Sequence, residues 1–191
     1  MRAPTLPLLA LTALSSVASA AYNRSAAVAH AALYYNRPQH DCSTPYTACS
    51  PWSYWGMEAC GFPSHGGDCA NFLSQNLLAG GHEHLTKAPC RGYPCGMEEV
   101  GAEKLGACLA ANYGWTSTCS AHAPPPANIV PGDALIFHGA SCADTEAHAT
   151  LVVYVNGDFV GLAAHSSDVF NKSYHDYATE FGFFDWLHYE G

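Results

Sequence analysis

The chain has 191 residues, 49% of them apolar, and its 16 acidic and 7 basic side chains give a formal net charge of −9. This length suits one domain with a substantial core. The acidic balance argues against nucleic acid as a partner, and against simple electrostatic attraction to anionic membranes or wall polymers.

Residues 1–20 have the composition of a secretory signal peptide. Arg2 is their only charged residue, an apolar run follows, and Ala18-Ser19-Ala20 fits a cleavage site. The apolar run is too short to cross a bilayer and no later stretch approaches that length, so we expect no membrane insertion. We expect a secreted, extracellular monomer whose residues 21–191 form a single domain with a net charge of about −10.

The mature chain opens with an alanine-rich segment over residues 25–35, which predicts a helix that stops before Pro38. Residues 38–65 are rich in cysteine, proline, serine, glycine and aromatic residues, which is typical of a loop held by disulfides. The aromatic side chains of this loop could line a substrate groove or cover the core.

Cys69 follows two glycines and Asp68, a preferred N-cap residue, and apolar residues then recur at helical spacing as far as Gly80-Gly81. Cys69 is therefore predicted in the first turn of a short helix. The N–H groups and dipole of that turn favour a thiolate, so we expect a lowered pKa for Cys69. The same N–H groups could face an oxyanion on a substrate carbonyl. The alternative is that Cys69 is half of a disulfide.

The cysteine count is odd, which in an oxidising compartment leaves one thiol over unless it bridges to another chain. If that thiol is Cys69, the other eight can form four disulfides. Asn23-Arg24-Ser25 and Asn171-Lys172-Ser173 are N-glycosylation acceptors if the secreting cell is eukaryotic. The nine cysteines are Cys42, Cys49, Cys60, Cys69, Cys90, Cys95, Cys108, Cys119 and Cys142.

The second half of the chain predicts a helix over residues 98–111 and a buried strand over residues 134–137. Residues 148–155 and 158–165 flank Asn156-Gly157, a strong hairpin signal. The aromatic residues 181–189 predict a closing strand. Helices first and then an antiparallel sheet define an α+β fold.

With Asn156-Gly157 as a two-residue turn, His148 is predicted directly opposite His165, with Cβ atoms about 4.5–5.5 Å apart. One imidazole could then hold the other in a fixed tautomer. Cysteine catalysis requires a thiolate, a base that later protonates the leaving amine, and a group that orients this base. Cys69, His148 and His165 fill these roles in chain order.

Five segments spread over most of the mature chain form a recognisable pattern: Tyr22-x-Arg24-x-Ala26-Ala27-Val28, Gly66-Gly67-Asp68-Cys69-x-Asn71-Phe72, Gly132-Asp133, Ala147-His148-Ala149 and Ala164-His165-Ser166. With these segments the sequence closely resembles the Putative amidase domain family. That family is similar to the papain-like amidohydrolases and peptidases that include bacterial cell-wall hydrolases. The resemblance implies a papain-like fold, with Cys69 as nucleophile, His148 as general base and acid, and His165 as the polar third member.

The leading hypothesis is a secreted cysteine amidohydrolase or peptidase that acts through an acyl-thioester, without a metal or other cofactor. The resemblance favours a peptide or peptidoglycan-type amide as substrate. The same acyl-enzyme could instead pass its acyl group to an amine. Cysteine-rich inserts depart from the family pattern, so the resemblance does not define the substrate groove. His175, Asn171 or Asp168 could replace His165 if the strand register slips.

Two other readings remain. The chain could be a non-catalytic secreted binding or defence protein on the same disulfide-linked scaffold. A metal site could also be formed by His65, His82, Glu83 and His84. Their spacing does not place two histidines on one helix face, as the spacing of His-Glu-x-x-His does, so solvated loop histidines are favoured.

Overall fold

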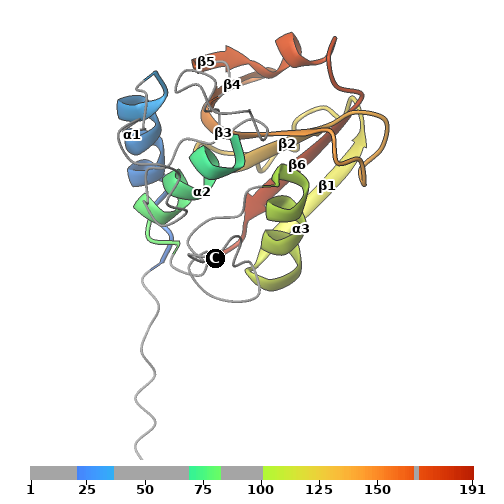
Figure 1. Cartoon of the computed structure of the whole chain (residues 1–191). Coiled ribbons are helices and arrows are strands. Elements are labelled where there is room, and N and C mark those ends of the chain that lie inside the picture. Colours follow the sequence, from blue (N-terminus) through green and yellow to red (C-terminus); the bar gives the residue numbers. More distant parts are fainter. Residues whose placement is uncertain (1–20, 37–68, 83–100, 166–167) are drawn as a thin grey trace, which may run out of the picture.

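A computed structural model describes residues 21–36, 69–82, 101–165 and 168–191 (Figure 1). Within these ranges the helices come first and a six-stranded antiparallel sheet follows, so the α+β class is confirmed. The helices are α1 (Arg24–Tyr34), α2 (Cys69–Ala79), α3 (Ala102–Asn112) and the short η3 (Tyr174–Tyr177). The strands are β1 (Trp115–Ala121), β2 (Ala134–His138), β3 (Ala147–Asn156), β4 (Phe159–Ala164), β5 (Val169–Ser173) and β6 (Phe183–Tyr189).

The sheet has the order β1-β6-β2-β3-β4-β5, and every neighbouring pair is antiparallel. The closing strand β6 therefore lies between β1 and β2. Figure 1 shows α1, α2 and α3 together on one side of the sheet, which we call the helix face. The opposite side, the aromatic face, packs mainly through Phe137, Tyr174, Tyr177, Phe184 and Trp186.

Helix α2 forms where its apolar spacing predicts it. Phe72, Leu73 and Leu77 are buried against the sheet, with at most 1% of each side chain exposed. The helix ends at Ala79, and Gly81 follows with a φ of 85°, a conformation that glycine adopts without strain. Asp68, the predicted N-cap, lies outside the described residues.

The helices and strands predicted with strong apolar patterns are found within a few residues of their expected bounds. The two edge strands and η3 were not predicted. In β1 only Trp115 is buried, and β5 reads Val-Phe-Asn-Lys-Ser with no buried residue. Edge strands with polar, exposed residues lack the hydrophobic alternation that identifies a strand.

Each of the three α-helices has 11 residues, and none in the described part of the chain has the length and apolar character to span a membrane.

Candidate active site

The strand and helix ends that carry the candidate residues meet at one edge of the sheet, where strands β2 and β4 end and β3 begins. The antiparallel register brings the ends of β2 and β4 beside the start of β3. At the other end, the Asn23 N–H donates to the Gly80 carbonyl at 2.7 Å, so α1 begins where α2 finishes. The start of α2 therefore lies toward the end of α1. We call this edge, with the end of α1 and the start of α2, the site edge.

Cys69 is the first residue of α2, as predicted, and 7% of it is exposed. Its sulfur is a thiol, whereas the other described cysteines, Cys108, Cys119 and Cys142, are in disulfides. Cys119 and Cys142 bond to each other, which joins the end of β1 to the loop between β2 and β3. The prediction that Cys69 keeps its thiol is confirmed in this part of the chain. The first helical turn, where Cys69 lies, has main-chain N–H groups without a partner inside the helix.

His165 directly follows β4 and lies on the helix face, with 1% exposed. Its ring stacks on Phe72 of α2, with centroids 4.5 Å apart and an interplanar angle of 8°. Its Nε2–H donates to the main-chain carbonyl of Tyr34, at the end of α1, at 2.9 Å. Phe72 is three residues after Cys69, and residues at this spacing are neighbours on a helix surface. His165 therefore packs on the same helical surface as Cys69.

The turn between β3 and β4 differs from the prediction. Asn156 pairs with Phe159, so Gly157 and Asp158 are the turn residues rather than Asn156 and Gly157. Gly157 has a φ of 58°, and Asp158 is not among the residues with positive φ. A glycine with positive φ in the first turn position is typical of a type II′ turn. Glycine thus determines which pair of residues turns.

A bulge between Val152 and Tyr154 then shifts the register again. Leu151, expected opposite Leu162, pairs with Ala163. The two shifts leave a net displacement of one residue, which moves a side chain to the other face of the sheet. The predicted cross-strand pair of His148 and His165 is therefore wrong.

His148 lies on the aromatic face of the sheet. Its ring centroid is 5.4 Å from that of Tyr177, 6.2 Å from that of Phe181 and 6.5 Å from that of Phe137. Its neighbours in the strand, Ala147 and Ala149, pack on the helix face instead. The two histidines thus share the site edge but lie on opposite faces of the sheet.

Comparison with known proteins identifies the family. Residues 21–183 match the family model described as Putative amidase domain. The chain belongs to this family. No curated protein and no solved structure matches the chain significantly. The matched range includes Cys69, His148 and His165, and membership in this amidase domain family indicates a hydrolase of amide bonds.

Two motifs that resemble the amidase domain family, Tyr22-x-Arg24 and Gly132-Asp133, contact each other across the fold. The Tyr22 hydroxyl donates to the Gly132 carbonyl at 2.7 Å, and Arg24 Nη2 donates to Asp133 Oδ1 at 3.2 Å. Burial, followed by the nearby Asp133 charge, raises the pKa of Tyr22 and keeps this hydroxyl a donor. The contacts lie at the far end of α1 from the site edge, which indicates that these motifs serve to hold α1 on the sheet.

The residues considered as replacements for His165 lie on the surface. Asp168, Asn171 and His175 are all exposed. Asn171 has a φ of 61° and its amide lies against Gly161, while the ring of His175 packs on Tyr174. His165 instead donates a hydrogen bond to the Tyr34 carbonyl, a main-chain group that no side-chain motif identifies.

His82, from the metal-site reading, belongs to the core. It is 2% exposed, and its Nε2 accepts a hydrogen bond from Trp115 Nε1 at 2.8 Å. Its ring also contacts Tyr22 and Tyr189. His65, Glu83 and His84 lie outside the described residues. Among the described residues, no group of three or more His, Cys, Asp or Glu is placed to hold a metal ion.

A buried polar cluster that we did not predict lies on the helix face near the end of β2 and the start of β6. His138 is 3% exposed, and its Nδ1–H donates to the Asp144 carbonyl at 3.1 Å. Asp185 is 8% exposed and accepts from the Ser117 hydroxyl at 2.6 Å. Burial raises the pKa of Asp185, and the Ser117 hydrogen bond and the His138 charge oppose this only in part.

The raised pKa of Asp185 predicts a pH-dependent gain in stability for Asp185→Asn. At neutral pH the asparagine still accepts from Ser117 but carries no buried charge, so we expect its Tm to exceed the wild-type Tm by roughly 2 °C or more. The native carboxyl holds its proton more tightly than the unfolded one, so the gain should shrink as the pH falls toward the ordinary aspartate pKa of about 3.9 and vanish near pH 3, where both states are protonated. Calorimetry of both proteins from about pH 3 to 8, with exposed Asp176→Asn as the control, measures this. A lower Tm for Asp185→Asn at pH 7 would contradict it.

Proposed function

We propose that this protein is a cysteine-dependent amidohydrolase or peptidase, with Cys69 as nucleophile and His165 as its acid–base partner. The observation that carries the proposal is the thiol of Cys69 at the start of α2, with an imidazole packed on the same helical surface. A helix N-terminus favours a thiolate, and an adjacent imidazole can exchange a proton with it.

Two observations support His165 rather than His148 as the partner of Cys69. His165 contacts Phe72 on the helix that carries Cys69, whereas the ring contacts of His148 are with Phe137, Tyr177 and Phe181 on the opposite face. The proton on Nε2 of His165 is also fixed, because a carbonyl can only accept. Nδ1 of the neutral ring then carries the lone pair that a base requires.

The reaction proceeds in two halves. The Cys69 thiolate attacks the amide carbonyl carbon, a C–S bond forms, and the C–N bond breaks as the His165 imidazolium gives its proton to the leaving amine. Water then attacks the thioester while His165 takes a proton from it. The C–S bond breaks, the acid is released and Cys69 is restored. Main-chain N–H groups in the first turn of α2 stabilise the oxyanion in both halves.

The arrangement supports a papain-like architecture, in which a helix that begins with the nucleophile packs against an antiparallel sheet that carries the histidine. We propose the same general plan here. The Cys119–Cys142 disulfide supports secretion into an oxidising compartment. By analogy with the family we propose a peptide or peptidoglycan-type amide as substrate.

The proposal is tested with purified bacterial sacculi and a set of peptide amides, followed by chemical labelling of new amino groups. We expect a time-dependent rise in amino groups with the native protein, and no rise once Cys69 has been alkylated with iodoacetamide. Equal release by the alkylated protein would overturn the cysteine mechanism. If native Cys69 fails to react with iodoacetamide below pH 8 and no substrate is cleaved, the protein is a binding protein instead.

A further inference from the structure

We infer that the C-terminal end of α1, through the main-chain carbonyl of Tyr34, is the third member of the catalytic group: it orients His165 and favours its charged form. The inference rests on the proposed function in one respect, the role of His165 as the partner of Cys69. It assigns to a helix end the task that cysteine hydrolases otherwise give to a polar side chain.

The Tyr34 carbonyl lies in the last turn of α1, where main-chain carbonyls accept from groups outside the helix. A carbonyl at the end of a helix would accept from the N–H four residues later, and that residue is Pro38, which has none. The Tyr35 N–H is already used, since it donates to the Ala31 carbonyl at 3.0 Å. His165 supplies the hydrogen bond from Nε2 at 2.9 Å.

Two contacts together fix the His165 ring. The Tyr34 carbonyl sets the direction of Nε2, and the flat face of Phe72, at an interplanar angle of 8°, sets the plane of the ring. At 1% exposure, water has almost no access to compete for the Nε2 hydrogen bond. A ring held at two points keeps Nδ1 in one direction, as a base that serves a fixed nucleophile requires.

Each of the two helix dipoles favours the charged form of the residue beside it, His165 or Cys69. The C-terminal end of α1 carries partial negative charge and favours a cation at His165, while the N-terminal end of α2 favours an anion at Cys69. The thiolate–imidazolium form is therefore favoured at both of its charges. Two helix ends of opposite polarity, brought to one edge by the antiparallel packing of α1 and α2, activate the thiol together.

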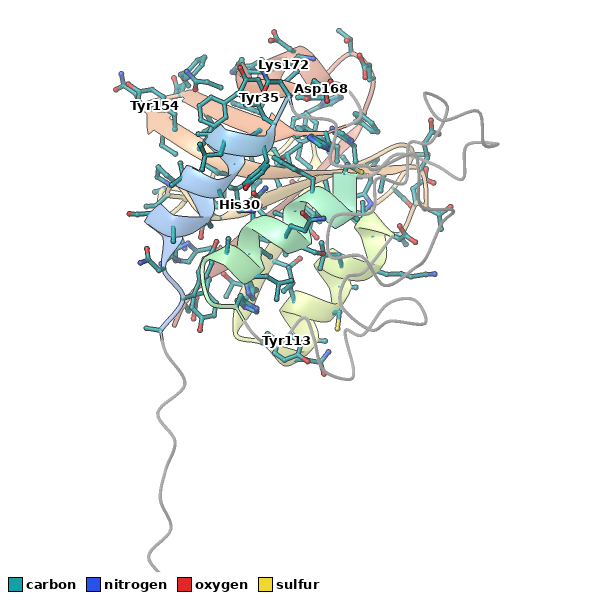
Figure 2. All side chains as sticks on the ribbon, turned by 60° about the vertical axis from the view of Figure 1, so that its left-hand side comes forward. His30, Tyr35, Tyr113, Tyr154, Asp168 and Lys172 are labelled. Atoms are coloured by element: carbon teal, nitrogen blue, oxygen red, sulfur yellow. A yellow bond between two sulfur atoms is a disulfide. The ribbon has the colours of Figure 1, made fainter. Side chains whose placement is uncertain are left out.

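The ionisable groups of His30, Asp168 and Lys172 also lie near α1 (Figure 2). His30 packs on the Tyr34 ring, with centroids 4.5 Å apart. Burial lowers the pKa of His30 and so favours its neutral form, and the Asn76 hydrogen bond opposes this only in part. Figure 2 shows His30 between α1 and α2, and shows Asp168 and Lys172 near Tyr35 at the end of α1. Asp168 is exposed and Lys172 lies over the Tyr177 ring. Of these groups, the end of α1 is therefore the one that places a buried partial charge beside His165.

The test replaces one peptide bond by an ester. Incorporation of the α-hydroxy analogue of tyrosine at position 35 turns the Tyr34 carbonyl into an ester carbonyl, a weaker acceptor, and keeps every side chain. The matched control carries the same replacement at position 34, which weakens the Leu33 carbonyl instead. Each variant loses one helical N–H donor, so their stabilities should be similar.

The readout is the rate of Cys69 alkylation by iodoacetamide against pH, in the full mature chain. We expect the midpoint of the position-35 variant to lie about 0.3–0.7 pH unit above that of the position-34 control, because the thiolate loses part of its counter-charge. Equal midpoints would overturn the inference. Alkylation needs no substrate, so a shifted midpoint in a protein that hydrolyses nothing would retain the inference and reject the hydrolase.

A second measurement uses the unmodified protein and so does not depend on folding of a variant. Long-range ¹H–¹⁵N spectra of neutral His165 should show the tautomer with the proton on Nε2. A proton on Nδ1 would overturn the inference whatever the ester variants show.

Discussion

Alanine at Cys69 or at His165 is expected to lower kcat/KM for amide hydrolysis by at least about 10³-fold, and His148→Ala by less than about 10-fold. In the proposed mechanism, loss of Cys69 removes the atom that forms the acyl-enzyme, and loss of His165 removes the group that takes and returns the proton. His148 lies on the aromatic face among Phe137, Tyr177 and Phe181, so its removal leaves the reacting pair in place.

The comparison between the two histidines is the informative part of this experiment. Each variant must keep the wild-type circular dichroism spectrum and melt cooperatively, since both rings are packed in the fold. In His165→Ala, Cys69 alkylation should also slow at neutral pH, whereas His148→Ala should alkylate like the wild type. The reverse pattern, in which His148→Ala is inactive and His165→Ala is active, would restore the role that the family resemblance implies for His148.

The position of Cys69 was predictable because the signals that define it are local. A glycine pair, an N-cap residue and apolar residues at helical spacing specify the start of a helix within a dozen residues of chain. These signals place Cys69 in the first helical turn without any knowledge of how the helix packs on the sheet. The odd number of cysteines then indicated that one thiol stays reduced, and the helix start made Cys69 the candidate.

The relation between His148 and His165 was not predictable in the same way. It depends on which two residues make the turn and on a bulge at Val152–Tyr154, and either shift alone changes the register. In a strand with period two, an error of one residue exchanges the faces. Family motifs recover the presence of both histidines but not the side of the sheet to which each points.

The orienting groups were beyond sequence patterns for another reason. Tyr34 acts through its main chain, so its side-chain identity carries no signal. Asp133 was visible only as part of a weak Gly-Asp motif. Its partners come from α1 and β6, and only the folded chain brings these segments to the start of β2.

Replacement of Asp133 by alanine is expected to lower the free energy of unfolding by about 3–5 kcal/mol. The Asp133 side chain is fully buried and its two oxygens accept from five donors. Arg24 and the Tyr189 N–H bind Oδ1, while His188 Nδ1–H, at 2.7 Å, and the Val130 N–H bind Oδ2. Alanine would leave these donors facing a small cavity without their acceptor.

Urea unfolding under non-reducing conditions, with the disulfides intact, measures this loss, and exposed Asp176→Ala serves as a control expected within about 0.5 kcal/mol of wild type. A loss below about 1 kcal/mol for Asp133→Ala would show that the carboxylate does not hold these segments together.

The same variant also reports on the site edge. Arg24 anchors the first residue of α1 and Tyr34 ends the same helix, so release of the anchor lets the whole helix shift. In the folded fraction, Cys69 alkylation at neutral pH should therefore slow as well, because the Tyr34 carbonyl keeps its place beside His165 only while the other end of α1 is held.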